Sequence, residues 1–362
     1  MFIILHLANG QVQDFSLKFV LPGHIDTLGL LLYNTDTLLF FSLSCGMFSR
    51  SDVFMEVLLQ LILLALGFAL LGKGADWFVE GASGIAHRFG ISELIIGLTI
   101  VAMGTSAPEA AVSIAASFSG NAGITLGNIV GSNILNILII LGLTALIRRL
   151  PVARGTLFVE MPYVLFITLV LYVLGRDGVL SHLDGAILIV LFIAYLAHLY
   201  ISARKNMSLE EDEEFGHTLG HDLLWLVGGG GVILLGSQVT VDAAVALAKY
   251  LGLSDRIIGL TIVALGTSLP ELFTSVTAAT KGNVDIAVGN IVGSNLFNIL
   301  FVVGVSSLLI PIPFEDAFMF DMYWCIGAAA ALFLACLPTK SLERWGGVAM
   351  LGAYAVYLYF IW

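Results

Sequence analysis

The sequence predicts an all-α integral membrane protein with ten transmembrane helices in two inverted five-helix repeats. Apolar residues make up 59% of the chain and charged residues only 11%, and the mean hydropathy is +1.00. A soluble protein carries about a quarter charged residues. In addition, the stretch that begins at Gly97 recurs at Gly259, 162 residues later, without a gap as far as Gly142 and Gly304. Duplicated polar motifs inside apolar segments are typical of membrane transporters built from internal repeats.

A transmembrane helix needs about 20 predominantly apolar residues. Ten segments meet this requirement: 57–80, 92–118, 124–147, 157–175, 184–203, 222–247, 256–280, 286–309, 319–337 and 344–361. The second and seventh segments contain the motif GTSxPE, and we expect both helices to be broken there because proline removes a backbone hydrogen bond. The third and eighth segments carry the motif GNIVGSNxxN.

We expect the first repeat to span residues 55–203 and the second 222–362, joined by an acidic, solvated loop at 204–221. Because each repeat has an odd number of helices, the second must enter the membrane in the opposite orientation. Nine Lys and Arg residues fall in loops after odd-numbered helices and three in loops after even-numbered helices. This bias predicts that loop 204–221 is cytoplasmic and that both termini lie outside.

Residues 1–54 lie outside the repeats and combine polar residues with an apolar stretch at 28–48. This N-terminal extension has three interpretations: an extra membrane segment, an atypical signal sequence, or an upstream start codon chosen in error. The segment before the apolar stretch lacks clustered Lys or Arg, which weakens the signal interpretation. We expect the functional chain to begin near Met55.

Several function classes are disfavoured by composition and motifs. Basic residues are too few and too scattered for a nucleic-acid surface. The three cysteines, Cys45, Cys325 and Cys336, have no CxxC spacing, so neither a disulfide framework nor a zinc site is indicated. An intramembrane enzyme is disfavoured because the chain has no HExxH or GxSxG motif.

The GTSAPE motif at 104–109 has the chemistry of a cation site. Pro108 lacks an amide hydrogen and therefore frees the carbonyl of Gly104, and freed carbonyls within a membrane are stable beside a bound ion or a polar cavity. Thr105 and Ser106 lie four and three residues before Glu109, so all three can approach one face of the helix. The second copy repeats this arrangement with Thr267, Ser268 and Glu271.

The partner helices contribute two pairs four residues apart: Ser132 with Asn136, and Ser294 with Asn298. If Glu109 faces Glu271, the result is an all-oxygen cluster, which suits hard cations such as calcium and sodium. Two carboxylates balance one divalent ion, and another cation or protons must replace it when it leaves. We assign Asn128, Asn133 and their equivalents to packing and hydrogen bonding.

These motifs resemble the two alpha repeats of the cation/calcium antiporter superfamily, most of all its prokaryotic sodium/calcium exchanger branch, over residues 55–362. The resemblance implies a ten-helix fold with inverted repeats and alternating access. It implies that calcium is bound by Glu109 and Glu271, with carbonyls at Thr105 and Thr267. It also implies that flanking sodium sites involve Ala102, Ser106, Ser132, Ala264, Ser268 and Ser294.

Asn136 and Asn298 stand where members of that superfamily have Asn or Asp. With two Asn residues the cluster contains only two acids, which argues against potassium co-transport. The predicted function is therefore sodium/calcium antiport in the plasma (inner) membrane. Proton/calcium antiport, antiport of another divalent cation and a passive cation channel are the alternatives. We expect small inorganic cations as substrates, the lipid bilayer as surroundings, no cofactor and no obligate protein partner.

Overall fold

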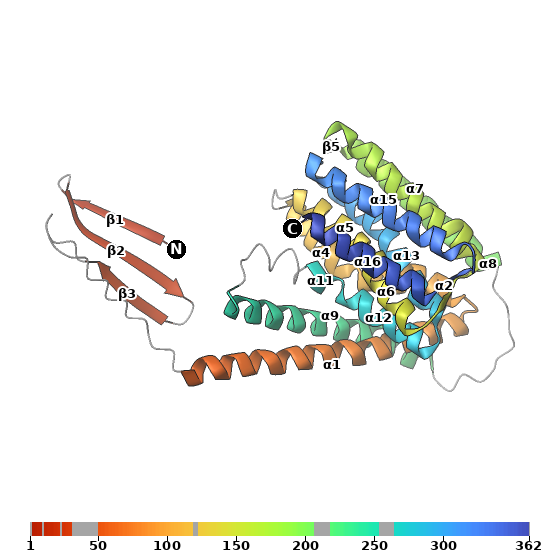
Figure 1. The fold of residues 1–362 in the computed structure, drawn as a ribbon, viewed down its shortest axis with the longest axis horizontal. Helices are drawn as coiled ribbons and strands as arrows, with labels where there is room; N and C mark the ends of the chain where they lie inside the picture. The colour runs from red at the N-terminus through yellow and green to blue at the C-terminus, as the bar shows by residue number, and fades with distance from the viewer. Residues whose placement is uncertain are drawn as a thin grey trace. The chain divides into compact units, whose positions relative to one another are not determined.

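A computed structural model of the chain describes residues 2–8, 11–21, 24–30, 50–118, 122–205, 218–252 and 264–361 (Figure 1). The chain divides into two compact units, Met1–Leu59 and Gln60–Trp362. Both copies of the GTSxPE and GNIVGSNxxN motifs lie in the second unit.

The N-terminal extension contains a three-stranded antiparallel sheet of order β1-β2-β3, with strands Phe2–Ala8, Gln11–Leu21 and His24–Leu30. Phe2 pairs with Lys18, and Phe15 pairs with Leu30. The all-α prediction is therefore wrong for this segment, where short runs of β-branched and aromatic residues favour strands. Most of the apolar stretch 28–48 lies outside the described residues, so the three interpretations of residues 1–54 stay predictions.

The remainder of the described chain is helical, apart from four two-residue strands. Its first half contains α1 (Arg50–Arg88), α2 (Glu93–Ile96), η1 (Gly97–Val101), α3 (Ala102–Thr105), α4 (Ala107–Phe118), α5 (Ala122–Leu135), η2 (Asn136–Leu141), α6 (Gly142–Ile147), β4 (Leu150–Pro151), η3 (Thr156–Glu160), α7 (Met161–Leu174), η4 (Gly175–Asp177), β5 (Val179–Leu180) and α8 (His182–Lys205). Its second half contains α9 (Leu219–Tyr250), α11 (Ala264–Thr267), α12 (Leu269–Lys281), α13 (Val284–Phe297), η6 (Asn298–Val303), α14 (Gly304–Leu309), β6 (Ile312–Pro313), α15 (Asp316–Cys336), β7 (Ser341–Leu342) and α16 (Arg344–Ile361).

Seven helices of the described residues are long and apolar enough to cross a membrane, and the broken pair Glu93–Thr105 and Ala107–Phe118 makes an eighth candidate. These eight correspond to the first six, the eighth and the ninth predicted segments. The seventh predicted segment, 256–280, lies partly outside the described residues and continues as α12. The tenth forms the 18-residue helix α16. Most of loop 204–221 also lies outside the described residues.

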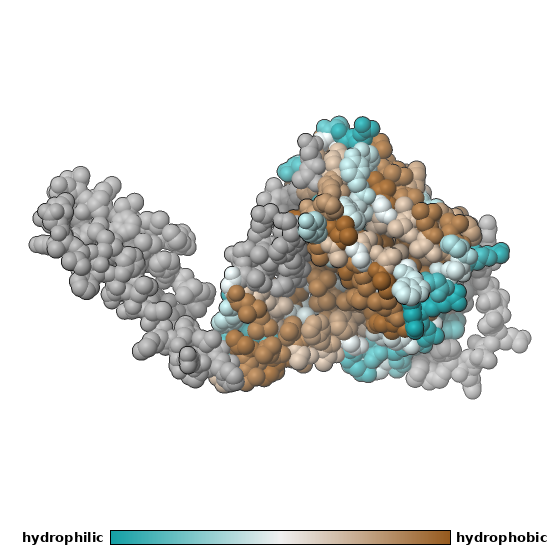
Figure 2. All heavy atoms as spheres, in the orientation of Figure 1, coloured by the Kyte–Doolittle hydropathy of each residue, from teal (hydrophilic) through white to brown (hydrophobic). Residues whose placement is uncertain are grey.

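Two helical segments form the centre of the membrane unit. In the 18-residue apolar stretch of each segment, 94% of the residues are buried for Val284–Leu309 and 78% for Thr125–Ile147. The corresponding shares are 11% for Met55–Arg88 and 22% for His182–Arg204. The outer helices therefore present apolar side chains outward, as a lipid-facing surface requires. Figure 2 shows apolar residues over much of the described surface, with hydrophilic residues gathered at its ends.

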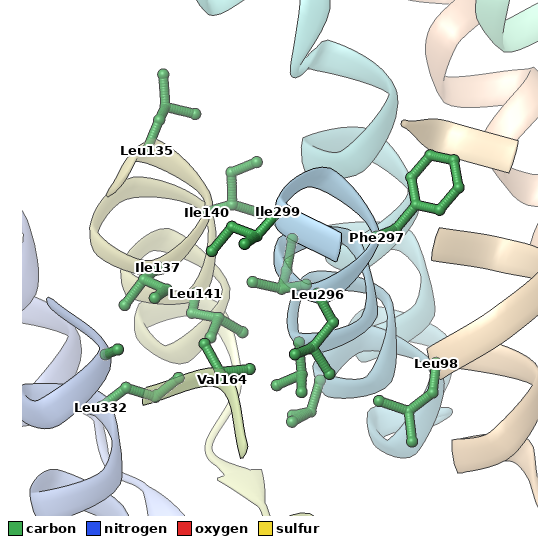
Figure 3. Packing of buried hydrophobic residues seen from close by; sticks show 14 of the residues in the cluster. Leu98, Leu135, Ile137, Ile140, Leu141, Val164, Leu296, Phe297, Ile299 and Leu332 are labelled. Atoms are coloured by element: carbon green, nitrogen blue, oxygen red, sulfur yellow. The ribbon is translucent and has the colours of Figure 1, made fainter. Parts of the chain in front are cut away.

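The buried core links the two central segments through aliphatic side chains. Ile140 of η2 and Ile299 of η6 are both buried in this core, and Figure 3 draws both among the side chains that pack there. At the helix ends, β4 pairs with β7 and β5 pairs with β6. Each of these pairs joins a strand from the first half of the chain to a strand from the second half. Contacts between the halves therefore run from the core to the loops.

Helices α1 and α9 approach so closely that glycine is required at their contact. A Cβ atom on Gly229 would lie 2.5 Å from the backbone nitrogen of Phe78 and 2.8 Å from the carbonyl oxygen of Gly74. Small residues that let helix backbones approach are typical of helix contacts in membranes. The neighbouring Gly228 has no atom within 4 Å of such a Cβ position. It therefore provides a matched control.

We predict that Gly229→Ala lowers the unfolding temperature of the protein and that Gly228→Ala does not. The added methyl group at Gly229 meets backbone atoms, and overpacking of this kind costs about 1–3 kcal/mol. At Gly228 the same change adds only helix propensity, worth about 0.8–1 kcal/mol in favour of the folded state. Heating detergent-solubilised protein and measuring the monodisperse fraction by size-exclusion chromatography would compare the two. Equal destabilisation by both changes would contradict the close contact.

Candidate cation-binding site

Both copies of the GTSxPE motif interrupt a helix at the serine. In the first copy α3 ends at Thr105 and α4 begins at Ala107, and the two helical parts meet at 49°. In the second copy α11 ends at Thr267 and α12 begins at Leu269. The proline that follows occupies the first turn of the new helix, where its missing N–H costs nothing. The predicted breaks are therefore present at Ser106 and at Ser268.

The two motif glutamates lie fully buried and are each bound by a serine of the other copy. The Ser106 hydroxyl donates a hydrogen bond of 2.7 Å to Oε1 of Glu271. The Ser268 hydroxyl donates one of 3.2 Å to Oε1 of Glu109. The side chains of Thr105 and Thr267 interact in the same crossed manner with Glu271 and Glu109. Neither copy of the motif therefore completes its carboxylate environment alone.

Four buried side-chain oxygens at this site have no hydrogen-bond donor among the residues that the structure describes. They are Oε2 of Glu109, Oε2 of Glu271, Oδ1 of Asn136 and Oδ1 of Asn298. We call these atoms the central oxygen cluster. Helix α4, which carries Glu109, packs against η6, which begins at Asn298; likewise α12, which carries Glu271, packs against η2, which begins at Asn136. Buried polar atoms are nearly always partnered, so four unpartnered acceptors indicate a site for a cation.

Hydrogen bonds between the copies orient the two asparagine amides of the cluster. The Asn136 amide nitrogen donates to Oδ1 of Asn295 at 3.1 Å, and that of Asn298 donates to Oδ1 of Asn133 at 3.2 Å. Asn133 and Asn295 in turn donate to each other's backbone carbonyls at 3.2 and 3.3 Å. Because each amino group is engaged across the interface, the amide oxygens of Asn136 and Asn298 remain available to a cation.

Two serines at this site were missed by the sequence reasoning. Ser113 and Ser275 are fully buried, and each accepts a hydrogen bond of 3.0 Å from the amide nitrogen of Asn128 or Asn290, respectively. These contacts fasten α4 to α5 and α12 to α13, and so hold the glutamates in place. The serines lie four residues after each glutamate and recur at the 162-residue offset. That recurrence is the signal that identifies them.

The remaining predicted site residues lie around this centre. Thr105 is buried and its hydroxyl donates to Oδ1 of Asn290 at 3.0 Å and to the carbonyl of Ala102 at 3.3 Å. The Ser294 hydroxyl reaches the same carbonyl at 3.5 Å. Ser132 and Ala102 are buried. Of Ala264 only the backbone is described, at the start of α11.

The donor set at the site consists of oxygen atoms. Within the described ranges there is no group of three or more His, Cys, Asp or Glu side chains able to hold a metal ion. Carboxylate, amide, hydroxyl and carbonyl oxygens are the ligands that calcium and sodium prefer, whereas softer metals bind His or Cys. The residues present therefore fit a hard cation.

Comparisons with known proteins identify the family of this chain. The sequence model described as "Sodium/calcium exchanger protein" matches residues 59–201 and 221–362. The chain is 40% identical over 317 residues to the "Putative antiporter CaxA" of Alkalimonas amylolytica, covering 84% of this chain and 99% of that protein. It is 36% identical over 314 residues to the "Inner membrane protein YrbG" of Escherichia coli (strain K12), covering 83% and 96%.

A solved structure of the sodium-calcium exchanger NCX_Mj, soaked with zero Na+ and Ca2+, superposes with a TM-score of 0.75. That structure is 34% identical, and the match covers 84% of this chain and all of the other. The helical membrane unit therefore has the fold of that exchanger. The matches cover nearly the whole length of each of these three proteins. This chain belongs to the sodium/calcium exchanger family.

Proposed function

We propose that this protein is a secondary antiporter that exchanges sodium for calcium across the plasma (inner) membrane by alternating access. The observation that carries the proposal is the central oxygen cluster: two carboxylate and two amide oxygens, all buried and without donors in the described chain. The family membership supports the same activity.

Calcium would be bound by Glu109 and Glu271, with Asn136 and Asn298 completing the cluster. Calcium takes six to eight oxygen ligands in flexible geometry, and the carbonyls at Thr105 and Thr267 would extend the set. The two negative charges of the cluster balance one calcium ion. Sodium would use the hydroxyl and carbonyl oxygens that flank the cluster, at Ala102, Ser106, Ser132, Ala264, Ser268 and Ser294.

The same charge balance explains why transport should be an exchange. If calcium left without replacement, two buried carboxylates would face each other with no cation, and unpaired buried charges are strongly destabilising. Loading sodium before the protein changes its access removes this cost. A passive channel is disfavoured because the cluster is buried on all sides by the two copies. Proton/calcium antiport and antiport of another divalent cation remain alternatives, and ion-substitution assays separate them.

We propose that the chain crosses the membrane ten times, with an inverted repeat at 55–203, a cytoplasmic acidic loop at 204–221 and the second repeat at 222–362. Three crossed hydrogen bonds support this arrangement because they recur with the copies exchanged, as in Ser106 to Glu271 and Ser268 to Glu109. The 162-residue offset also relates η2 to η6, β4 to β6 and β5 to β7. A two-fold relation between the halves accounts for all of these pairs.

We predict that Glu109→Gln and Glu271→Gln each weaken calcium affinity roughly 10- to 150-fold, because each removes one charge-assisted contact worth about 1.5–3 kcal/mol. Both variants should fold, since a neutral amide is cheaper to bury than an unpaired carboxylate. The measurement is the calcium dependence of uptake into sodium-loaded vesicles. Parallel vesicles loaded with potassium or with protons identify the counter-ion.

Glu343→Gln is the matched control, because Glu343 is partly exposed and pairs with Arg149 at 2.7 Å. A surface ion pair contributes about 0–1 kcal/mol to stability, so this variant should transport calcium normally. Normal calcium exchange in both Glu109→Gln and Glu271→Gln would refute the proposed site.

We predict that a cysteine at Ser208 resists an impermeant thiol reagent in intact cells, because loop 204–221 is proposed to be cytoplasmic. The background would lack Cys45, Cys325 and Cys336. A cysteine replacing the exposed Asp177, which follows the fourth segment, should react readily and serves as the control. Rapid labelling at position 208 together with protection at position 177 would reverse the proposed orientation.

We predict that transport responds to membrane potential, since sodium is proposed to carry more charge per cycle than the calcium it replaces. If the excess is one elementary charge, 100 mV biases each cycle by about 2.3 kcal/mol. Calcium uptake into sodium-loaded vesicles would be measured with a potential set by potassium and valinomycin. Uptake should increase when the imposed potential favours the net outward movement of positive charge that accompanies the exit of sodium. Uptake that ignores the potential would indicate electroneutral exchange.

A further inference from the structure

A second group of buried polar atoms without partners lies away from the central oxygen cluster. It consists of the Thr156 hydroxyl oxygen, Oε2 of Glu160 and the Tyr195 hydroxyl, none of which has a hydrogen-bond partner in the described part of the chain. All three residues are at most 5% exposed. Neither motif contains them, and the proposed exchange does not use them. An ionisable group buried within a membrane segment is costly and requires an explanation.

The short helix η3 carries two of these three side chains. Thr156 and Glu160 begin and end the π-helix η3, a form of helix that often marks functional sites. Oε2 of Glu160 lies 3.7 Å from the position that a Cβ atom on Gly155 would take, so the carboxylate turns back towards the start of η3, next to Thr156.

Helix α8 supplies the third group. The Tyr195 ring stacks on Tyr163 of α7 at 5.6 Å, and the Tyr163 hydroxyl donates to the carbonyl of Leu191 at 3.1 Å. Glu160 interacts electrostatically with Tyr195 and with the exposed His198, one turn further along α8. The carboxylate therefore faces α8, with the phenol beside it.

At the equivalent place in the other half of the chain, the tyrosine hydroxyl has a hydrogen-bond partner. At the 162-residue offset, Tyr195 corresponds to Tyr357, whose hydroxyl donates to Oδ1 of Asp321 at 2.9 Å. Thr156 and Glu160 correspond to Phe318 and Met322, which need no polar partner. The second half thus pairs its tyrosine directly with an acid. The first half instead leaves a carboxylate, a phenol and a hydroxyl without hydrogen-bond partners in the described part of the chain.

Three hard oxygen ligands and a single negative charge define the ligand that would satisfy them. A divalent ion would leave one uncompensated positive charge in an apolar layer, which is costly. An alkali cation balances the carboxylate and accepts hydroxyl and phenol oxygens as ligands. We propose that Thr156, Glu160 and Tyr195 form a second cation site, which binds one sodium or potassium ion and is separate from the central oxygen cluster.

Helix α8 also connects this second cation site to the centre. Phe192 packs against Phe297 and Phe301, with ring centroids 6.1 and 5.5 Å apart. Phe297 directly precedes Asn298, and Phe301 lies three residues after it. A cation held between η3 and α8 would therefore stabilise the helix that supports one side of the central oxygen cluster.

The test uses full-length protein carrying both Glu109→Gln and Glu271→Gln, so that its result does not depend on calcium exchange. The unfolding temperature is measured in sodium chloride, potassium chloride and choline chloride at equal ionic strength. When the concentration of the cation is about ten times its dissociation constant, its binding should raise the unfolding temperature by about 2–4 °C relative to choline chloride. The salt that produces the rise identifies the ion.

Adding Glu160→Gln should abolish this cation-dependent rise, whatever the change does to the absolute stability. Tyr195→Phe keeps the ring that stacks on Tyr163 and removes one ligand, so the rise should shrink but remain. Asp321→Asn, which removes a membrane carboxylate from the other half, is the matched control and should leave the rise intact. An equal rise with and without Glu160→Gln would overturn the site. So would a parent protein that responds to pH and not to sodium or potassium, because the group would then bind a proton.

Discussion

Two carboxylates buried in the middle of an apolar protein impose the constraint on which the rest of the structure depends. Glu109 and Glu271 are fully buried, and each receives a hydrogen bond from a serine hydroxyl of the other half of the chain. A hydroxyl inside a membrane must find an acceptor, and a carboxylate must find donors or a cation. The halves therefore have to pack face to face with both broken helices at the contact. The central position of Thr125–Ile147 and Val284–Leu309 follows from this requirement.

The asparagines determine what the centre can bind. An amide can present either an N–H group or an oxygen to a neighbour, and an N–H aimed at a glutamate would satisfy the carboxylate without an ion. Asn133 and Asn295 prevent this because they engage the amino groups of Asn298 and Asn136. Ser113 and Ser275 act similarly next to the glutamates, because their hydroxyl oxygens accept hydrogen bonds from the amide nitrogens of Asn128 and Asn290, respectively. Polar groups that do not touch the proposed cation thus keep four oxygens free for it.

The two halves agree closely at the centre and differ in the outer layer. Helices that face lipid need only an apolar surface and satisfied backbone hydrogen bonds, so many sequences meet their requirements. Tyr195 and Tyr357 occupy equivalent places, yet only Tyr357 has an acid as its direct partner. Residues at the interface between the halves have less freedom, because a change there alters hydrogen bonds in both copies.

The sequence alone determined the membrane class, the interrupted helices and the two acids, Glu109 and Glu271, that lie in the repeated motifs. These follow from local rules: apolar length predicts spanning helices, proline breaks a helix at a known distance, and a gapless duplication predicts equivalent positions for Glu109 and Glu271. Tertiary structure decided the rest. The crossed bond from Ser106 to Glu271 joins residues 165 positions apart, and no local pattern predicts which half supplies the donor. The free oxygens of Asn136 and Asn298, and the unpaired group at Glu160, likewise depend on how distant helices meet. The periodicity of a sequence indicates which face of a helix or strand is apolar. The hydrogen-bond partners of its polar side chains, by contrast, depend on which faces pack against each other.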